Sequence, residues 1–244
     1  MHREIHNWWS PRLNKHMEIA VYGHYGFAVL MFPTAGADYL EYERFHLLDT
    51  LAPMIDQGKF KVFSINSINN ESWLNNNMHP YDKAVRHQQY NEYVLREVVP
   101  FIYTHCQGHV PIITTGASLG ALHAANIFFR RPDVFDGTIA MSGVYRLTAY
   151  TRGYFDDNVY FNSPIDYLPN WGDEFMLNRM REKGGNIIIA SGQGEYEDPS
   201  SSIELSNILH GKGVPHMLDL WGHDMRHDWP TWRQMLPYFL GTKF

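Results

Sequence analysis

A serine stands between two glycines in the stretch Gly116-Ala117-Ser118-Leu119-Gly120, where an apolar β-branched run gives way to a helical pattern. A strand that turns at once into a helix strains the residue at the turn, and small neighbours give the two elements clearance. The turn exposes the hydroxyl beside helix N–H groups that favour a developing negative charge. The pattern therefore favours Ser118 as a nucleophile over a serine that only caps the helix.

A serine hydroxyl is a poor nucleophile at neutral pH, so a histidine must take its proton and a carboxylate must orient that histidine. For a serine on a strand-turn-helix elbow, the carboxylate and then the histidine follow along the chain. Past the last apolar run, the stretch "WGHDMRHDWPTWRQ" offers His223 and His227. His227 lies just before the last helical pattern and is the favoured base, with His223 as its competitor.

The acid is expected after the preceding apolar run, where "NIIIASGQGEYEDPSSS" supplies Glu195, Glu197 and Asp198 in one loop. Spacing from a glycine turn favours Glu197, although Glu195 stands equally far beyond an earlier glycine. Asp198, just before a proline, suits the cap of the helix expected near Ser200. The sequence favours Glu197 and leaves the other two carboxylates open.

Backbone amides are expected to hold the negative oxygen that forms when the serine attacks. One amide follows the nucleophile, at Leu119, and a second comes from the loop after the apolar run 27–32. That loop, Pro33-Thr34-Ala35-Gly36, is built of small residues that let the backbone approach a substrate. Ala35 is the candidate donor, within a choice of residues 34–36.

His223 and His227 also have a spacing that could place two metal ligands on one helix face. Pro230 indicates that the helix begins after both histidines, and no third ligand stands at a recognisable spacing. The sequence thus disfavours a metal site here, and the chemistry expected of Ser118 needs no cofactor.

Strand-like and helix-like segments alternate along the chain. The apolar, β-branched runs predict strands within 18–23, 27–34, 61–67, 111–116, 137–145, 186–192 and 216–222. Helical spacing predicts helices at 42–57, 81–106, 118–131, 200–213 and 230–241. This alternation predicts an α/β fold with a mostly parallel central sheet, helices on both faces and an antiparallel N-terminal edge.

One segment breaks the alternation. Residues 146–185 form a long, aromatic-rich connection between two strands, which is typical either of a lid-like insertion or of an ordinary crossover helix with a long lead-in. No linker divides residues 1–244, so we expect a single domain.

The composition of the chain argues against nucleic acid and a membrane as binding partners. The net charge is −6 and no run of Lys or Arg could neutralise a phosphate backbone, so nucleic acid is not an expected partner. Cys106 is the single cysteine, which excludes an internal disulfide. The first residues lack the apolar run of a secretory signal, and no stretch is long and apolar enough to span a bilayer. We expect a cytoplasmic protein that does not engage the membrane.

The chain resembles the esterase D and enterochelin-esterase branch of the α/β hydrolases, which also includes the mycolyltransferase antigens. The resemblance covers most of the chain and rests on "LMFPTAG", "GASLGALHA", "SGVYRL" and "HDWPTW". In this family the catalytic histidine stands two residues before one tryptophan and five before another, which implies His227 ahead of Trp229 and Trp232. The family's "G-E-x-E" turn implies Glu197 as the acid. Pro33-Thr34 departs from the Asp-Gly or His-Gly pair that many members carry in the oxyanion loop.

These observations predict a serine carboxylic-ester hydrolase that acts on a small or medium ester through an acyl-serine intermediate. Ser118 would attack, His227 would accept its proton and Glu197 would orient the imidazole. An acyltransferase would use the same residues, and a non-catalytic binding protein could share the fold. The sequence leaves the natural ester and the oligomeric state open.

Overall fold

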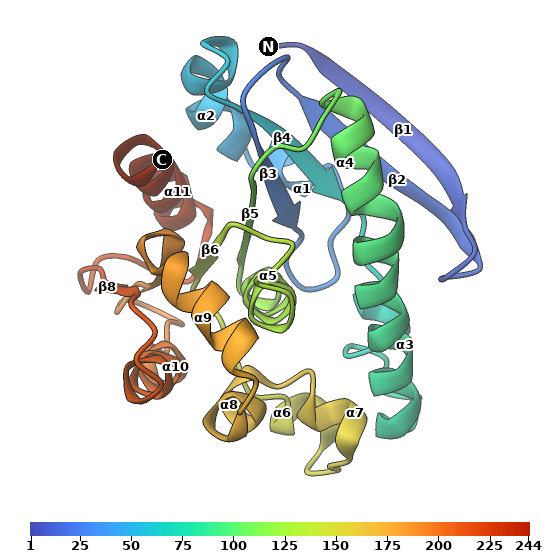
Figure 1. Ribbon diagram of the computed structural model, residues 1–244, viewed down its shortest axis with the longest axis vertical. Helices are drawn as coiled ribbons and strands as arrows, with labels where there is room; N and C mark the ends of the chain where they lie inside the picture. Colours follow the sequence, from blue (N-terminus) through green and yellow to red (C-terminus); the bar gives the residue numbers. More distant parts are fainter.

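The computed structural model describes residues 1–244, which build one eight-stranded sheet in the order β1-β2-β4-β3-β5-β6-β7-β8 (Figure 1). The strands are β1 (Arg3–Ser10), β2 (Lys15–Tyr22), β3 (Phe27–Phe32), β4 (Phe60–Ile65), β5 (Ile112–Ala117), β6 (Gly137–Met141), β7 (Ile187–Ser191) and β8 (Met217–Leu220). β2 pairs antiparallel with both β1 and β4, and every other neighbouring pair is parallel. The predicted mostly parallel sheet with an antiparallel N-terminal edge is confirmed.

How deeply each strand is buried explains whether its sequence predicted a strand. β4, β5, β6 and β7 have every residue buried, because crossover helices cover both faces of a parallel sheet. Such strands are visible as continuous apolar runs. β1 alternates between exposed and half-buried residues and carries charged residues and histidines, so no apolar run marked it and residues 3–10 were not predicted as a strand.

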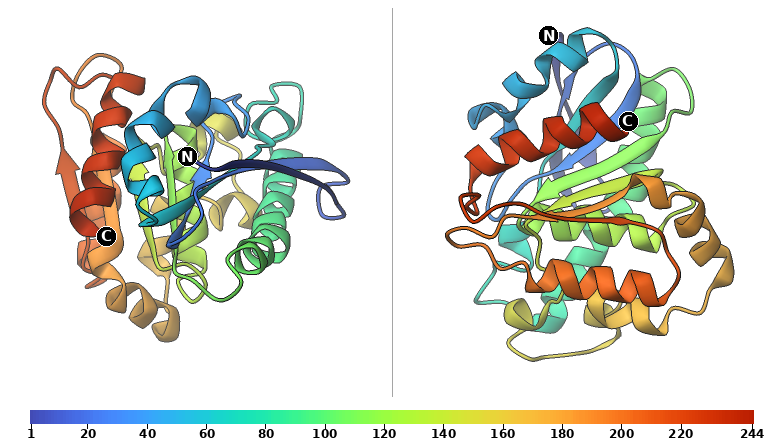
Figure 2. Two further views of the ribbon diagram at one scale, coloured as in Figure 1. Left: turned by 90° about the horizontal axis from the view of Figure 1, so that it is seen from above. Right: turned by 90° about the vertical axis from the view of Figure 1, so that its left-hand side faces the viewer.

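Helices cover both faces of the sheet (Figure 2). Buried residues of α2 (Leu47–Asp56) and α11 (Trp229–Lys243) pack on one face. The larger core, on the other face, includes residues of α3 (Pro80–Tyr93), α4 (Val99–His105), α5 (Leu119–Arg130) and α10 (Ser200–Gly211). A π-helical turn, η2 (Val94–Val98), joins α3 to α4. The five predicted helices are confirmed to within a few residues, with α1 (Glu41–Arg44) separate from α2.

The long connection after β6 folds into short helices (Figure 1). They are α6 (Thr148–Thr151), α7 (Asp157–Tyr160), α8 (Pro164–Tyr167), η3 (Leu168–Asn170) and α9 (Glu174–Glu182), followed by η4 (Gly184–Asn186). Of these, α7 packs on α3, and α8 packs on α5 and α10. Hydrogen bonds tie the connection to α3, from Lys83 Nζ to the Tyr150 carbonyl at 3.2 Å and from Asn91 Nδ2 to Asn162 Oδ1 at 2.7 Å. None of the helices has the length and apolar character needed to cross a bilayer.

Candidate active site

Ser118 occupies the turn between β5 and α5 with φ 56° and ψ −122°, a conformation that costs a non-glycine residue free energy. The glycines on either side allow this turn because no side chain would fit there. A Cβ on Gly116 would lie 2.3 Å from the carbonyl carbon of Gly120, and a Cβ on Gly120 would lie 2.3 Å from the Phe32 carbonyl oxygen. The sequence therefore folds into the strained elbow that the spacing predicted.

The Ser118 hydroxyl does not take part in capping the helix that it precedes. The residue sits at the N-cap position of α5, yet its side chain makes no capping hydrogen bond. Its amide donates to the Met141 carbonyl at 2.9 Å, which fixes the elbow against the end of β6. Ser118 is thus not simply a helix cap, and its Oγ makes no hydrogen bond to His227 in this structure.

His227 and Glu197 form a hydrogen-bonded pair, with 3.1 Å between Nδ1 and Oε2. The Glu197 side chain is 1% exposed and the His227 side chain 27% exposed. Because the carboxylate oxygens act as acceptors, the imidazole donates from Nδ1, and Nε2 is left as the acceptor for a proton.

Three further donors hold the Glu197 carboxylate in place. Ser142 Oγ donates to Oε1 at 2.5 Å, the Gly192 amide to Oε1 at 3.3 Å, and Ser191 Oγ to Oε2 at 3.4 Å. Trp232 Nε1 in turn donates to Ser142 Oγ at 3.0 Å. Each of these hydrogen bonds restricts rotation of the buried carboxylate, so it is held in the orientation that bonds His227 Nδ1.

Ser118 and the Glu197–His227 pair all lie in loops at the carboxyl ends of the parallel strands. β5, β6 and β7 are consecutive neighbours, and adjacent strands lie about 4.8 Å apart. Ser118 follows β5 and bonds through its amide to Met141, while the next residue, Ser142, holds Glu197 in the loop after β7. Ser118, Ser142 and Glu197 therefore follow the carboxyl ends of three adjacent strands, and His227 comes from the loop after the fourth, β8.

The two tryptophans that follow His227 pack against the imidazole and at the start of α11. The Trp232 ring packs edge-on against the imidazole, with centroids 5.2 Å apart and planes at 84°. Trp229 stacks on Phe45 at 4.6 Å, which anchors the start of α11. The main chain adds one more tie, from the His227 amide to the Glu195 carbonyl at 3.0 Å. The imidazole is held by packing on one side and by the acid loop on another.

The competing candidates have other partners. The Glu195 carboxylate is half exposed and faces Arg226 at 3.5 Å. Asp198 accepts from the Ser200 amide at 3.0 Å at the start of α10, and hydrogen bonding to the Ser200 side chain, followed by its amide, lowers the pKa of the Asp198 carboxyl. His223 is exposed, and its Nδ1 lies 3.2 Å from the Gln193 carbonyl. Of the three carboxylates, only that of Glu197 is hydrogen-bonded to the His227 side chain. His223 has a different partner, the Gln193 carbonyl.

The loop after β3 narrows the choice of oxyanion donor. The Thr34 amide donates to Glu41 Oε2 at 2.8 Å, and Thr34 Oγ1 donates to Oε1 of the same carboxylate. The amides of Ala35 and Leu119 have no acceptor within the protein. Of residues 34–36, Thr34 is therefore the one whose N–H is already engaged.

Glu41 and Ser142 are the residues of this site that sequence reasoning did not single out. Glu41 is 4% exposed, and burial raises the pKa of its carboxyl against the opposing effect of the bonds from Thr34. The neighbouring Tyr42 hydroxyl donates to the Phe32 carbonyl at 2.6 Å. A charged residue in the first turn of a helix looks like a surface residue in sequence, and only the fold shows it buried under the loop.

Comparison with known proteins gives a family and several structural neighbours. The family model described as "Putative esterase" matches residues 48–241. A ferulic acid esterase structure shares 17% identity over 100% of this chain and 99% of its own, with a TM-score of 0.71. An S-formylglutathione hydrolase from Agrobacterium tumefaciens shares 12% identity over 98% of this chain and 93% of its own, with a TM-score of 0.73.

A second S-formylglutathione hydrolase, from Staphylococcus aureus, shares 15% identity over 98% of this chain and 96% of its own, with a TM-score of 0.68. Curated protein sequences give no match. At such low identities the structural likeness establishes the fold alone, while the family match covers most of the chain. Together they confirm the resemblance inferred from the motifs.

Proposed function

The chain belongs to the Esterase family, and we propose that it hydrolyses carboxylic esters through an acyl-serine intermediate formed on Ser118. Ser118 Oγ attacks the ester carbonyl while His227 Nε2 takes the hydroxyl proton. The tetrahedral intermediate places its negative oxygen at the amides of Leu119 and Ala35. When it collapses, the bond to the alcohol breaks, and His227 returns its proton to the leaving oxygen.

The second half of the cycle reverses these roles. Water attacks the acyl-serine carbonyl and gives its proton to His227 Nε2. Collapse of the second tetrahedral intermediate releases the carboxylic acid and restores the Ser118 hydroxyl with the proton from His227. All groups that move a proton belong to the chain itself, and no cofactor enters the scheme.

Glu197 acts through the imidazole in this scheme. Its bond to Nδ1 selects the tautomer with Nε2 free and stabilises the imidazolium that forms after each proton transfer. The donors from Ser142, Ser191 and Gly192 keep the carboxylate in one orientation. The single observation that supports the proposal is the buried bond between Glu197 and His227 at the carboxyl ends of the strands, the end of the sheet where the strained Ser118 also lies.

A panel of p-nitrophenyl esters with acyl groups of different length and with aromatic acids tests this function. We expect turnover by the wild-type chain, a fall of at least about a thousandfold in kcat for Ser118→Ala, and no effect of a metal chelator. Circular dichroism serves as the fold control. Ser118→Ala activity close to that of wild type, in a folded variant, would rule out the acyl-serine route.

An acyltransferase would share every residue of the scheme and differ in what reaches the acyl-enzyme. Product analysis with and without an added alcohol separates the two activities. We expect free acid as the main product in both cases. A new ester as the main product at modest alcohol concentrations would identify transfer as the activity.

The connection 146–185 is proposed as a lid-like insertion that contacts the substrate, because it follows directly from β6 beside Ser142. Tyr154 and Tyr160 are half-buried aromatic residues in it. We expect Tyr154→Ala and Tyr160→Ala to change the ranking of the esters in the panel. An unchanged ranking in both variants would contradict a role in substrate choice.

A further inference from the structure

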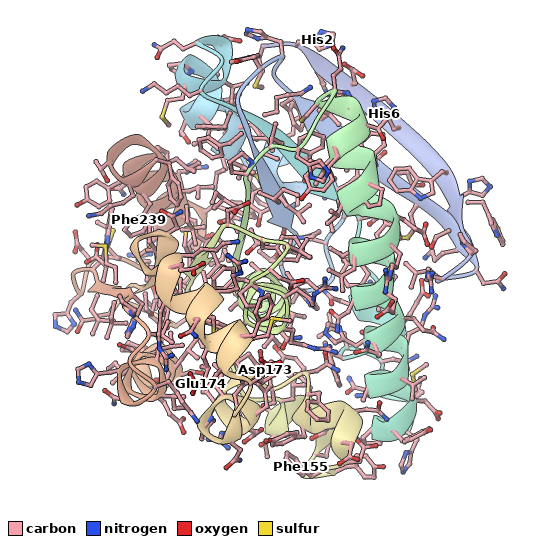
Figure 3. All side chains as sticks on the ribbon, viewed as in Figure 1. His2, His6, Phe155, Asp173, Glu174 and Phe239 are labelled. Atoms are coloured by element: carbon pink, nitrogen blue, oxygen red, sulfur yellow. The ribbon has the colours of Figure 1, made fainter.

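A second cluster of chemically active side chains lies at the other end of the sheet, between β1 and α4. Glu4 and His6 stand two residues apart on β1, so their side chains lie on one face of the strand, and His2 directly precedes it. His105, the last residue of α4, comes to the same place from far along the chain. His6 lies beside the end of α4, and His2 near the start of β1 (Figure 3).

One carboxylate is the centre of this cluster. His6 Nε2 lies 2.8 Å from Glu4 Oε2, and His105 Nε2 lies 3.2 Å from the same oxygen. The ligand atoms of Glu4, His6 and His105 are all within 4.8 Å of one another. His2 Nε2 lies 2.7 Å from the other oxygen, Glu4 Oε1. Three imidazoles thus face one carboxyl group.

Two imidazole nitrogens and one carboxylate oxygen form a ligand set that binds Zn²⁺, with bonds of about 2.0–2.2 Å and a fourth position left for another ligand. We infer that Glu4, His6 and His105 form a zinc-type metal site, with His2 or water at the fourth position. The three ligand atoms need to move by about an ångström or less each to surround an ion at those bond lengths. The ion would tie the edge strand to the helix that packs on it.

Aromatic packing aims the two imidazoles before any ion binds. His6 packs edge-on against Phe101, with centroids 5.0 Å apart. His105 packs against Phe63 at 5.6 Å with planes at 90°, and it meets His6 at 5.5 Å. The rings are held by neighbours that offer no competing ligand, which is the support that a metal site needs.

The cluster is open to solvent, since the side chains of His6 and Glu4 are 35% and 33% exposed, and a cavity of about 440 Å³ borders His105. Lys61, His105 and Cys106 line it, together with His24 and residues at the start of β3. His105 therefore borders open space on one side and the carboxylate of Glu4 on the other. A hydrated ion can reach the ligands without unfolding the strand.

Lys61 sets how strongly the site can bind. Its ammonium donates to His105 Nδ1 at 2.7 Å and lies 3.3 Å from the His105 carbonyl. A metal-bound neutral imidazole donates from the nitrogen that does not bind the metal, and an ammonium cannot accept that bond. Lys61 thus opposes binding at His105 Nε2, whereas a glutamine there offers a carbonyl oxygen to Nδ1.

The cluster is separate from the proposed ester chemistry. Lys61 lies at the start of β4 and His105 just before β5, so the cluster is at the amino ends of the parallel strands. Ser118 and His227 lie at the carboxyl ends. Loss of the ion should leave ester hydrolysis unchanged, and loss of Ser118 should leave ion binding unchanged.

Isothermal titration of the chelator-treated full chain with Zn²⁺ tests the site, with Mg²⁺ as a control ion because it prefers oxygen ligands. We expect one saturable Zn²⁺ site with a dissociation constant in the micromolar range or below, and none for Mg²⁺. Glu4→Gln and His6→Gln should each weaken binding at least tenfold, and Lys61→Gln should strengthen it several-fold. His16→Gln is the matched control, since His16 is an exposed histidine on β2 that pairs with Asn7.

Absence of saturable Zn²⁺ binding by the wild-type chain would overturn the proposal. So would binding that is unchanged in Glu4→Gln and His6→Gln, because the ion would then lie elsewhere. Weaker binding by Lys61→Gln would contradict coordination through His105 Nε2. Circular dichroism and hydrolysis of a p-nitrophenyl ester by each variant report that the chain is folded.

Discussion

Two of the histidines that follow Ser118 along the chain, His123 and His227, differ in burial and in hydrogen-bond partner, which are the properties that decide whether an imidazole can accept a proton. His123 lies on α5, is 3% exposed, and donates from Nε2 to Asn69 Oδ1 at 2.7 Å. Burial lowers the pKa of His123 to about 3. His227 is more than a quarter exposed and has Glu197 on Nδ1. Closeness in sequence to the proposed nucleophile is therefore a poor guide to the base, whereas a carboxylate on one ring nitrogen and an unbonded second nitrogen favour His227.

The largest expected effect comes from exchanging these two histidines for glutamine. We expect His227→Gln to lower kcat for a p-nitrophenyl ester by about a thousandfold or more, because the proton acceptor is lost. His123→Gln keeps a donor toward Asn69 and should change kcat by less than about tenfold. A larger loss in a folded His123→Gln chain than in His227→Gln would reverse the assignment.

The acid loop offers the next comparison. Glu197→Gln should lower kcat by about a hundredfold to ten-thousandfold, since a neutral amide no longer stabilises the imidazolium. Glu195→Gln and Asp198→Asn remove exposed carboxylates that do not touch His227, so we expect kcat within about threefold of wild type. Steady-state kinetics on the three variants would contradict the assignment if Glu195→Gln showed the largest loss.

A smaller effect is expected at the loop that carries Ala35. Glu41→Gln leaves only one oxygen to accept from the amide and hydroxyl of Thr34, so the loop loses one of its two ties. We expect kcat to fall about tenfold with little change in KM, because the oxyanion forms only during reaction. Glu43→Gln, on the same short helix, is the control; Glu43 pairs with Arg3 and Tyr22 instead. Equal kcat in the two variants would argue against this positioning role.

The smallest expected effect is on the pH dependence of the free energy of unfolding. His87 and His123 are buried with centroids 5.0 Å apart, and burial lowers the pKa of both. Each therefore binds a proton more readily in the unfolded chain, whose histidines titrate near pH 6.5, so the unfolding free energy falls as the pH drops below that value. The slope reaches about 1.4 kcal/mol per pH unit for each histidine.

Urea unfolding at several values between pH 5 and pH 7 measures this slope, in a range above most carboxyl titrations. We expect His87→Phe to make this slope shallower, because it removes one of the buried histidines whose pKa is lowered. A slope that stays the same in His87→Phe would mean that His87 does not resist protonation in the folded chain.

The local sequence pattern was sufficient to predict those features of the structure that depend on residues close together in the chain. The elbow at Ser118 needs only a strand, a helix and two glycines close together, and the buried parallel strands are visible as apolar runs. β1 was missed because one of its faces meets solvent, which gives an alternating polar sequence instead of an apolar run. Its position at the sheet edge could not be read from residues 3–10 alone.

The choice among the carboxylates depended on distant contacts. Glu195 and Glu197 share one loop and have the same spacing from a glycine, so the sequence could only favour one of them. Ser142, 55 residues away, and Trp232 select Glu197 by burying and bonding it in the folded chain. Glu41 was missed for the same reason, since its burial under the loop of Thr34 is a property of the tertiary structure.

The most direct test of the account is to label the chain with a fluorophosphonate, which reacts with activated serine hydroxyls, and to locate the adduct by peptide mass spectrometry. We expect a single adduct on Ser118 in the wild-type chain, much slower labelling of His227→Gln, and none on folded Ser118→Ala. Labelling of a different serine, or ester hydrolysis that continues in an unlabelled Ser118→Ala chain, would contradict the central claim that Ser118 is the nucleophile.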